Sequence, residues 1–261
     1  MDHPARLKAQ DISLAFAKNT PVLRDLSVDI PDGKITVIIG PNACGKSTLL
    51  RSLARLQPTD TGEIKLDGTS IRRQNSRAVA RQLAILPQNP TAPEGLSVRD
   101  LVSRGRTPYQ SALRQYGHDD ASKIDEALAM TGMSHNAHRP IDALSGGQRQ
   151  RAWIAMTLAQ DTEILLLDEP TTFLDLPHQM ELLKLVQQLN TDTGRTVAMV
   201  LHDINLAARF AHHIIALKDG RVLVEGTPDE VITTATMAEI FDLSCTIIAD
   251  PVSGTPHVIP T

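Results

Sequence analysis

The chain has few cysteines and few aromatic residues. Its 261 residues include two cysteines, Cys44 and Cys245, and only 3% are Phe, Trp or Tyr. Two cysteines cannot form a disulfide framework, so a small disulfide-stapled fold is excluded and a reducing compartment is expected.

Long hydrophobic runs and an excess of positive charge are also absent. The longest apolar stretches, such as 35–39, 164–167 and 197–201, fall far short of the ~20 residues that span a bilayer. Their length is that of buried strands. The first residues carry no apolar signal core, which predicts that the chain stays in the cytoplasm. The formal net charge of −4 argues against a general nucleic-acid-binding protein.

Strand patterns dominate the first seventy residues. Alternating apolar residues and a Pro-Asp-Gly turn predict an antiparallel sheet within the first thirty. Residues 35–39 are apolar on both faces, as in a parallel sheet. They lead through a glycine-rich loop into a helix expected from the apolar pattern of Leu49, Leu50, Leu53 and Leu56. A further strand over 62–68 is expected to end in an Asp-Gly turn.

The character of the chain changes between Gln88 and Arg139. This stretch has several prolines, many polar residues and no strong strand pattern, which predicts a helical insertion. We take the insertion, with the helix that follows it, to extend over about residues 88–160. It interrupts a single domain that covers residues 1–261.

Strands and helices alternate again after the insertion. We expect a strand over 164–167, a helix over 177–190 and a strand over 197–201. A short helix should follow Asp203, and a hairpin should cover 214–225. The tail over 250–261 is expected to be an irregular, proline-broken stretch. The whole pattern predicts an α/β nucleotide-binding core with an N-terminal antiparallel β subdomain and an inserted α-helical subdomain.

The glycine-rich loop carries a specific chemical motif. Residues 40–47, GPNACGKS, fit the phosphate-binding pattern G-x-x-x-x-G-K-[ST] between a buried strand and a helix. Backbone N–H groups and the helix N-terminus would cradle phosphate oxygens. Lys46 would reach the β- and γ-phosphates, and Ser47 would ligate Mg²⁺. The predicted nucleotide-binding residues are Gly40, Pro41, Asn42, Ala43, Cys44, Gly45, Lys46, Ser47 and Thr48.

Two residues of this loop raise further expectations. If Ala43 needs a positive φ, alanine there costs on the order of 1 kcal/mol. Cys44 lies beside Lys46 and a helix N-terminus, which is expected to lower the pKa of its thiol and make it reactive.

A buried strand ends in two carboxylates, Asp168 and Glu169. Open α/β sheets bind ligands at the carboxyl ends of their strands. Asp168 is expected to hold Mg²⁺ through water, and Glu169 to polarise the attacking water. The alternative is a strand followed by two solvated acids.

A second glycine-rich segment, LSGGQ at 144–148, precedes a helical run. Ser145, Gly146, Gly147 and Gln148 would then lie at a helix N-terminus, which favours an anion. One phosphate chain does not need two such ends from a single chain. We therefore expect this second end to cap a nucleotide that another copy holds.

These motifs, in this order, resemble those of the ATP-binding cassette (ABC) ATPase family. LSGGQ matches the signature sequence of the family, and the resemblance runs from about residue 7 to the end. Residues 172–175, TFLD, are similar to the D-loop S-x-L-D, with Thr172 in the first place. The resemblance implies that Gln88 is the Q-loop glutamine, which senses Mg²⁺ and water, and that Asp175 is the D-loop aspartate. It also implies that His202 is the switch histidine near the γ-phosphate and that Phe16 is the aromatic residue stacked on adenine. The family more often has Tyr at that last position, and Gly at the position of Ala43.

Whole segments are similar to the ATPases of bacterial ferric-siderophore importers, the ferric-enterobactin type especially. They cover residues 102–109, 145–160, 168–175 and 248–260. This resemblance implies an ATPase motor that uses ATP and Mg²⁺ and forms an ATP-dependent homodimer. It also implies two membrane permease subunits, a substrate-binding protein acting indirectly, no nucleic acid, and a peripheral place on the cytoplasmic face of the inner membrane. Haem and cobalamin importers are close relatives and remain alternatives for the cargo.

The permease is expected to press a short helix into a groove near residues 88–109. Eight arginines concentrate in or near this stretch and form either a solvated face or a surface for the permease and anionic lipid headgroups. They are Arg72, Arg73, Arg77, Arg81, Arg99, Arg104, Arg106 and Arg114.

The competing class is a soluble ABC ATPase without a permease. Sustained heptads, as in a DNA-repair coiled coil, are absent, and one phosphate loop with one signature argues against a two-cassette translation protein. An ATPase of iron–sulfur assembly remains open. Glu169 disfavours a nucleotide sensor that does not hydrolyse. The siderophore cannot be named, because cargo is not expected to touch this subunit.

Overall fold

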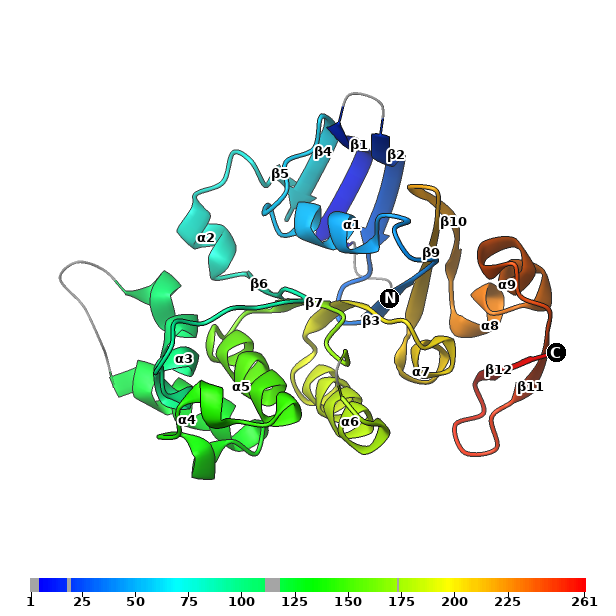
Figure 1. Ribbon diagram of the computed structural model, residues 1–261. Coiled ribbons are helices and arrows are strands. Elements are labelled where there is room, and N and C mark those ends of the chain that lie inside the picture. The colour runs from blue at the N-terminus through cyan, green and yellow to red at the C-terminus, as the bar shows by residue number, and fades with distance from the viewer. Residues whose placement is uncertain (1–4, 18–19, 111–117, 173) are drawn as a thin grey trace.

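The computed structural model describes residues 5–17, 20–110, 118–172 and 174–261 (Figure 1). Phe173 of the D-loop and Arg114 of the arginine group therefore lie outside the described residues. None of the described helices is both long and apolar enough to span a membrane.

The core is a six-stranded sheet in the order β10-β9-β3-β8-β7-β6. Its strands in chain order are β3 (Ile35–Ile39), β6 (Leu83–Leu86), β7 (Ile164–Asp168), β8 (Thr196–Val200), β9 (His213–Lys218) and β10 (Arg221–Gly226). Five of them are parallel and only β10, at one edge, is antiparallel. The carboxyl ends of β3, β6, β7 and β8 therefore meet at one edge of the sheet, and all of the predicted motif loops but one leave from there.

The two faces of this sheet pack against different cores. In β3, Ile35, Val37 and Ile39 face a core that contains the helices of the insertion, whereas Ile38 faces a second core. Both kinds of position are apolar, which explains why the parallel strands read as continuous hydrophobic runs. The predicted central strands are confirmed.

An antiparallel sheet lies above the second core. It has the order β2-β1-β4-β5 and consists of β1 (Leu7–Ala17), β2 (Thr20–Ile30), β4 (Thr61–Leu66) and β5 (Thr69–Ser70). Helix α1 (Lys46–Leu53) lies between this sheet and the core sheet and buries Leu49, Leu50 and Leu53 (Figure 1). The expectation for Leu56 is wrong: α1 ends at Leu53, Arg55 adopts a left-handed φ of 61°, and Leu56 is 60% exposed.

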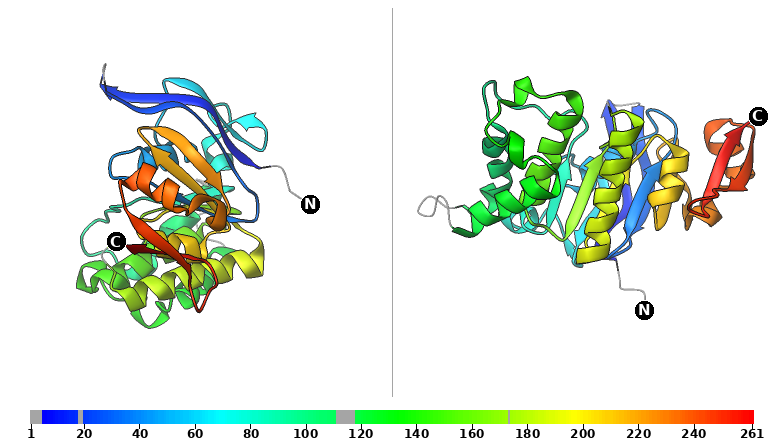
Figure 2. Two further views of the ribbon diagram at one scale, coloured as in Figure 1. Left: turned by 90° about the vertical axis from the view of Figure 1, so that its right-hand side faces the viewer. Right: turned by 90° about the horizontal axis from the view of Figure 1, so that it is seen from below.

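The predicted helical insertion is confirmed, and Figure 2 shows it at one end of the molecule. After α2 (Ser76–Ala80) and strand β6 it comprises α3 (Val98–Ser103), the 3₁₀-helix η1 (Arg104–Tyr109), α4 (His118–Met130), the 3₁₀-helices η2 (Ser134–Asn136) and η3 (Ile141–Ala143), and α5 (Gly146–Ala159). Helix α5 packs against α3, α4 and η1, and so joins the insertion to the core.

The C-terminal part lies at the other end of the molecule (Figure 2). After α6 (Leu176–Thr193) and α7 (Ile204–Phe210) come α8 (Pro228–Val231), α9 (Thr234–Phe241) and the antiparallel pair β11 (Cys245–Ala249) and β12 (Pro256–Pro260). Asp203 caps α7 as predicted. Helix α6 starts one residue before the expected Pro177, because Asp175 is its N-cap.

The expectation of an irregular tail is wrong. Residues 256–260 form a regular strand that pairs with β11 in full register. Of the three prolines in this stretch, Pro251 lies in the turn before β12, and Pro256 and Pro260 occupy the first and last positions of the strand. Proline lacks a backbone N–H, but at these two end positions its absence affects only the ends of the hydrogen-bond ladder between β11 and β12.

One member of the predicted basic face is a buried side chain. Arg106 is 5% exposed, donates from Nε to Asp120 at 2.8 Å and from Nη1 to the carbonyl of Ala159 at 2.9 Å. Its guanidinium also lies 4.0 Å from the ring centroid of Tyr109. Arg106 therefore joins η1 to α4 and α5 and does not contribute to a surface.

We expect Arg106→Met to destabilise the protein by about 3–5 kcal/mol, because the buried carboxylate of Asp120 loses a charged partner. Arg104→Met is the matched control, since Arg104 is exposed two residues earlier and its loss should change stability by less than about 0.5 kcal/mol. Urea unfolding of the two variants measures the difference. Equal stabilities would contradict the role assigned to Arg106.

Candidate functional site

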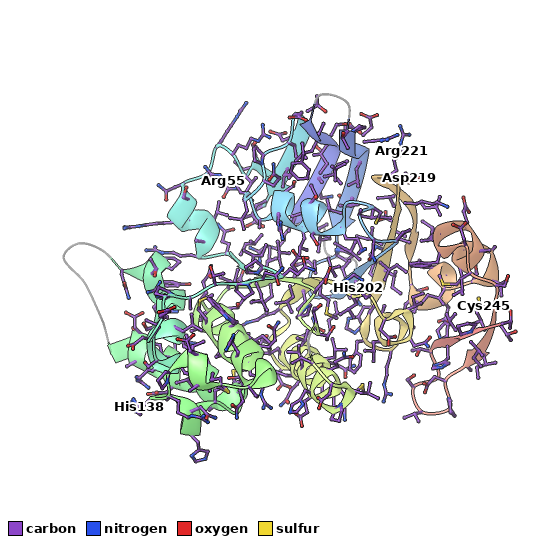
Figure 3. All side chains as sticks on the ribbon, viewed as in Figure 1. Arg55, His138, His202, Asp219, Arg221 and Cys245 are labelled. Atoms are coloured by element: carbon purple, nitrogen blue, oxygen red, sulfur yellow. The ribbon has the colours of Figure 1, made fainter. Side chains whose placement is uncertain are left out.

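An open cavity of ≈ 860 Å³ lies above the carboxyl edge of the core sheet. It brings together the predicted residues Phe16, Gln88, Glu169 and His202 with the phosphate loop over 41–48. Figure 3 labels two of the residues that line it, His202 after β8 and Asp219 in the turn between β9 and β10. Residues from β2, from the turn after β9 and from the end of α9 complete its walls.

The phosphate loop depends on its two motif glycines. Gly40 has φ 149°, and a Cβ there would lie 2.3 Å from the carbonyl oxygen of Leu217. Gly45 has φ 105°, and its Cβ would lie 2.8 Å from the carbonyl oxygen of Val22. Only glycine fits these positions, because both combine a positive φ with a close backbone approach. Ala43 has a φ of 62°, so the condition under which alanine was expected to be unfavourable is met. The loop therefore carries the strain of an alanine in the left-handed conformation.

Lys46 is buried at the base of this loop. Its Nζ donates to the carbonyl oxygens of Gly40 at 2.9 Å and Pro41 at 2.8 Å. Both acceptors belong to the loop, so the ammonium group lies within the curve of the backbone. This places a fixed positive charge beside the backbone N–H groups at the start of α1.

The predicted lowering of the pKa of the Cys44 thiol is wrong. The side chain is buried, and this burial raises the pKa of the Cys44 thiol although the charge of Lys46 opposes it. The negative charge of Asp219 raises the pKa further. Proximity to a lysine and to a helix start is visible in the sequence, whereas the burial that outweighs both is not.

Asp168 joins the tip of β7 to the phosphate loop. Its Oδ1 accepts a hydrogen bond of 2.7 Å from the Ser47 hydroxyl, and its Oδ2 lies 3.4 Å from Nη2 of Arg51. Asp168 is 0% exposed, and burial raises its pKa against the opposing effects of Ser47 and Arg51. Among the described residues Oδ2 finds no hydrogen-bond donor, because the contact with Arg51 is an ion pair without hydrogen-bond geometry.

These groups fit a magnesium ion. Mg²⁺ prefers hard oxygen ligands and binds proteins through one or two side-chain oxygens, water and phosphate oxygens. Ser47 Oγ and the Asp168 carboxylate are such oxygens, and the unmet capacity of Asp168 Oδ2 suits a cation or its water. Gln88, which lines the same cavity, carries a further amide oxygen.

Glu169 is held by three side chains from separate segments. Its Oε2 accepts from Gln88 Nε2 at 2.6 Å and from Thr172 Oγ1 at 3.1 Å, and its Oε1 lies 2.8 Å from His202 Nε2. Burial acts to raise the pKa of Glu169, but the hydrogen bond and charge of His202, with Gln88 and Thr172, outweigh it and lower the pKa. The site therefore holds an ionised carboxylate that can accept a proton from water or orient it.

The backbone at Glu169 is strained. Its φ of 51° is left-handed, a conformation that costs a non-glycine residue of order 1–3 kcal/mol and is often found at functional sites. The turn lets Asp168 and Glu169 serve different partners: Asp168 contacts Ser47 below, and Glu169 contacts Gln88 and His202 in the cavity.

Sequence reasoning did not foresee the contact of Thr172 with Glu169. The only available signal was the hydroxyl three residues after the glutamate, in a segment interpreted as a D-loop. The walls formed by residues 218–220 and 240–242 were also missed. The first wall belongs to the turn of the predicted hairpin. The second belongs to helix α9, for which no helix was predicted.

Phe16 lines the cavity and is 65% exposed. An exposed aromatic ring in a cavity wall suits stacking on a flat base. Stacking itself stays a prediction.

The signature residues lie outside this cavity. Ser145 caps α5: its hydroxyl oxygen accepts from the backbone N–H of Gln148, and its own backbone N–H donates to Oε1 of Gln148, which completes a capping box. Gly146 and Gly147 form the first turn of α5, and a Cβ at Gly147 would lie 3.4 Å from Leu174 of the D-loop.

One hydrogen bond connects the signature helix to the catalytic edge, and the D-loop aspartate caps the next helix. Gln150 of α5 donates to the carbonyl of Pro170, directly after Glu169, at 2.9 Å. Asp175 caps α6 and contacts the ring of His178. The structure thus brings Phe16, Gln88, Glu169, His202 and the phosphate loop together, and leaves residues 145–148 and Asp175 on a separate part of the surface.

The comparisons with known proteins identify the family. Residues 23–172 match the family model described as ABC transporter. The chain therefore belongs to the ABC transporter family, in which it is an ATP-binding and ATP-hydrolysing subunit.

The relatives are more specific. The chain is 49% identical to the ferric enterobactin transport ATP-binding protein FepC of Escherichia coli (strain K12), over 98% of this chain and 94% of the relative. It is 51% identical to the iron(3+)-hydroxamate import ATP-binding protein FhuC of Bacillus subtilis (strain 168), over 96% and 93% of the two chains. The predicted resemblance to this group is confirmed.

Solved structures agree on the fold. An ABC transporter of the metal-chelate type in an inward-facing conformation superposes with a TM-score of 0.84 at 26% identity, over 99% of this chain and 98% of the other. A dimeric post-hydrolysis state of the ATP-binding cassette MJ0796, bound to ADP and Pi, superposes with a TM-score of 0.75 at 28% identity, over 85% and 98%.

Proposed function

We propose that this chain hydrolyses ATP to drive the import of ferric siderophores through a membrane permease. The observation that carries the proposal is the Glu169 carboxylate, held ionised by three partners at the edge of the phosphate-loop cavity. The similarity to FepC and FhuC over nearly the whole chain supports the cargo class. Those relatives are named for two chemically different iron chelates at similar identity, so we propose the class and not one siderophore.

Each group at the cavity has a role in this reaction. Residues 40–48 and Lys46 would bind the phosphates, and Phe16 would stack on adenine. Ser47, Asp168 and Gln88 would hold Mg²⁺, which neutralises phosphate charge when bound. Glu169 would orient and deprotonate the attacking water, and His202 would lie between Glu169 and the γ-phosphate.

We also propose an ATP-dependent, head-to-tail homodimer. Residues 145–148 form the capped start of a helix that no nucleotide in this chain's own cavity would reach. In a head-to-tail pair this helix start and Asp175 of one copy would close the cavity of the other. The dimeric cassette similar to this chain supports the arrangement.

The partners would be two permease subunits, with a substrate-binding protein acting through them. A hollow of ≈ 270 Å³ between α3 and α4 lies in the predicted 88–109 region and is lined by Arg99, Asp100, Ser103, Ala121 and Ile124. Its size and mixed lining support a contact with a short permease helix. The chain would then lie on the cytoplasmic face of the inner membrane as a peripheral subunit.

We expect Glu169→Gln to bind MgATP and form a dimer but to hydrolyse at least about 100-fold more slowly, because an amide is a very poor proton acceptor. Asp168→Asn is the matched comparison one residue earlier, and it should impair magnesium-dependent binding instead. Size-exclusion chromatography with MgATP and a phosphate-release assay separate the two. Hydrolysis by Glu169→Gln at the parental rate would remove Glu169 from the catalytic role.

We expect Ser145→Arg to abolish hydrolysis while ATP binding to the single chain stays within about twofold, because the change falls outside the chain's own cavity. Fluorescent-nucleotide titration of the isolated subunit gives the binding constant, and phosphate release gives the rate. An equal loss of binding would count against the shared site.

The cargo is tested by reconstituting the chain with its permease and binding protein in vesicles. We expect ferric catecholate or hydroxamate siderophores to stimulate hydrolysis several-fold over the unliganded complex. Haem and cobalamin are the controls, and stimulation by either one alone would replace the proposed cargo. Failure of the chain to copurify with any polytopic permease would favour the soluble class.

A further inference from the structure

The C-terminal hairpin packs against the helix that follows the switch histidine. Figure 1 shows α7 between the core sheet and the pair β11–β12, and β12 contacts α7 directly. Val258, in the middle of β12, is buried and belongs to the same core as Ala207 and Phe210 of α7. The hairpin is therefore part of the core and not an appendage.

The side chain of Asn205 makes hydrogen bonds across this contact. The Oδ1 of Asn205 accepts from the backbone N–H of Val258 at 2.8 Å, and its Nδ2 donates to the carbonyl oxygen of the same residue at 3.2 Å. The Nδ2 also lies 3.4 Å from Nε2 of His257. An amide that pairs with both backbone groups of one residue fixes the hairpin in a single register on α7.

Asn205 lies close to the catalytic edge in the chain. Helix α7 begins at Ile204, and Asp203 caps it by accepting from the N–H of Leu206 at 2.9 Å. His202 comes directly before this cap and reaches Glu169 at 2.8 Å. The side chain of His202 is 48% exposed, so the short helix after it largely determines where the imidazole lies.

The C-terminal part touches the site from a second side as well. Ile240, Phe241 and Asp242, at the end of α9, line the cavity. The chain then runs through residues 243–244 into β11. One continuous segment thus borders the cavity wall and holds the helix behind His202.

From these contacts we infer that Asn205 is a positioning residue: by clamping the C-terminal hairpin to α7, it holds His202 in place beside Glu169. The inference rests on the proposed catalytic role of His202. It assigns to residues 245–260 a part in setting the hydrolysis rate, although none of them lies in the cavity.

The test is a set of variants assayed for steady-state ATP hydrolysis. Asn205→Ala removes both hydrogen bonds to Val258, and Asn205→Asp keeps the size of the side chain but loses the donor. Val252→Ser is the matched control, since Val252 is 78% exposed in the turn of the same hairpin. Both Asn205 variants should lower kcat by about 10- to 100-fold, the effect of a misplaced catalytic group, while KM for ATP changes less than about twofold. Val252→Ser should match the parent.

A double-mutant cycle with His202→Ala separates positioning from general stability. If Asn205 acts through His202, Asn205→Ala should not slow the residual hydrolysis of His202→Ala further. Full additivity of the two losses, or a parental kcat in both Asn205 variants, would overturn the inference. Should Asn205→Ala fail to fold, Asn205→Asp carries the same cycle. A parent chain that does not hydrolyse ATP would instead refute the proposed function.

Discussion

The hydrogen bond between Ser47 and the buried carboxylate of Asp168 joins the phosphate loop to the strand next but one in the sheet. The rest of the site depends on this bond. Strand β7 can place a carboxylate there only because both of its faces are covered by apolar cores, which fix the height of its tip. The Asp168 carboxylate is bonded to Ser47 of the phosphate loop. The left-handed backbone conformation at Glu169 then turns the next carboxylate toward the cavity. The strained backbone at Glu169 therefore lets two adjacent acids have different contacts: Asp168 bonds to the phosphate loop, and Glu169 faces the cavity.

Much of this arrangement can be predicted because it follows local rules. The phosphate loop, the acids at a strand tip and the serine cap of α5 each combine a motif with a strand or helix boundary that hydrophobic periodicity reveals. What could not be predicted depends on burial and distant partners. In the sequence the thiol of Cys44 looks reactive and the guanidinium of Arg106 looks exposed, but Cys44 is buried in the second core and Arg106 is buried against Asp120. The contact of Thr172 with Glu169 depends on the turn between them.

The separation of the signature helix from the cavity is what the proposed head-to-tail pair would explain. A capped helix start with exposed glycines binds anions well, and Ser145 and Gly146 are both exposed. Gln150 connects this helix to the carbonyl after Glu169, and Leu174 packs near Gly147. A partner's nucleotide that docks on residues 145–148 would therefore act on α5, and α5 is bonded to the segment that carries this chain's own Glu169. Such a link gives a route for coupling between two sites.

The C-terminal part extends this reasoning beyond the residues that the family model matches. His202 and everything after it lie outside the matched range 23–172, yet the similarity to FepC and FhuC covers nearly the whole chain. A histidine at the end of a central strand has a fixed backbone but a half-exposed side chain, so its direction needs a second constraint. Helix α7 is too short to be stable alone, because helices below about 12 residues are marginal without tertiary packing. Helix α7 packs against β3 and α8, and the hairpin adds to this packing through Val258 and Asn205. The C-terminal strand therefore stabilises a helix none of whose residues lines the cavity.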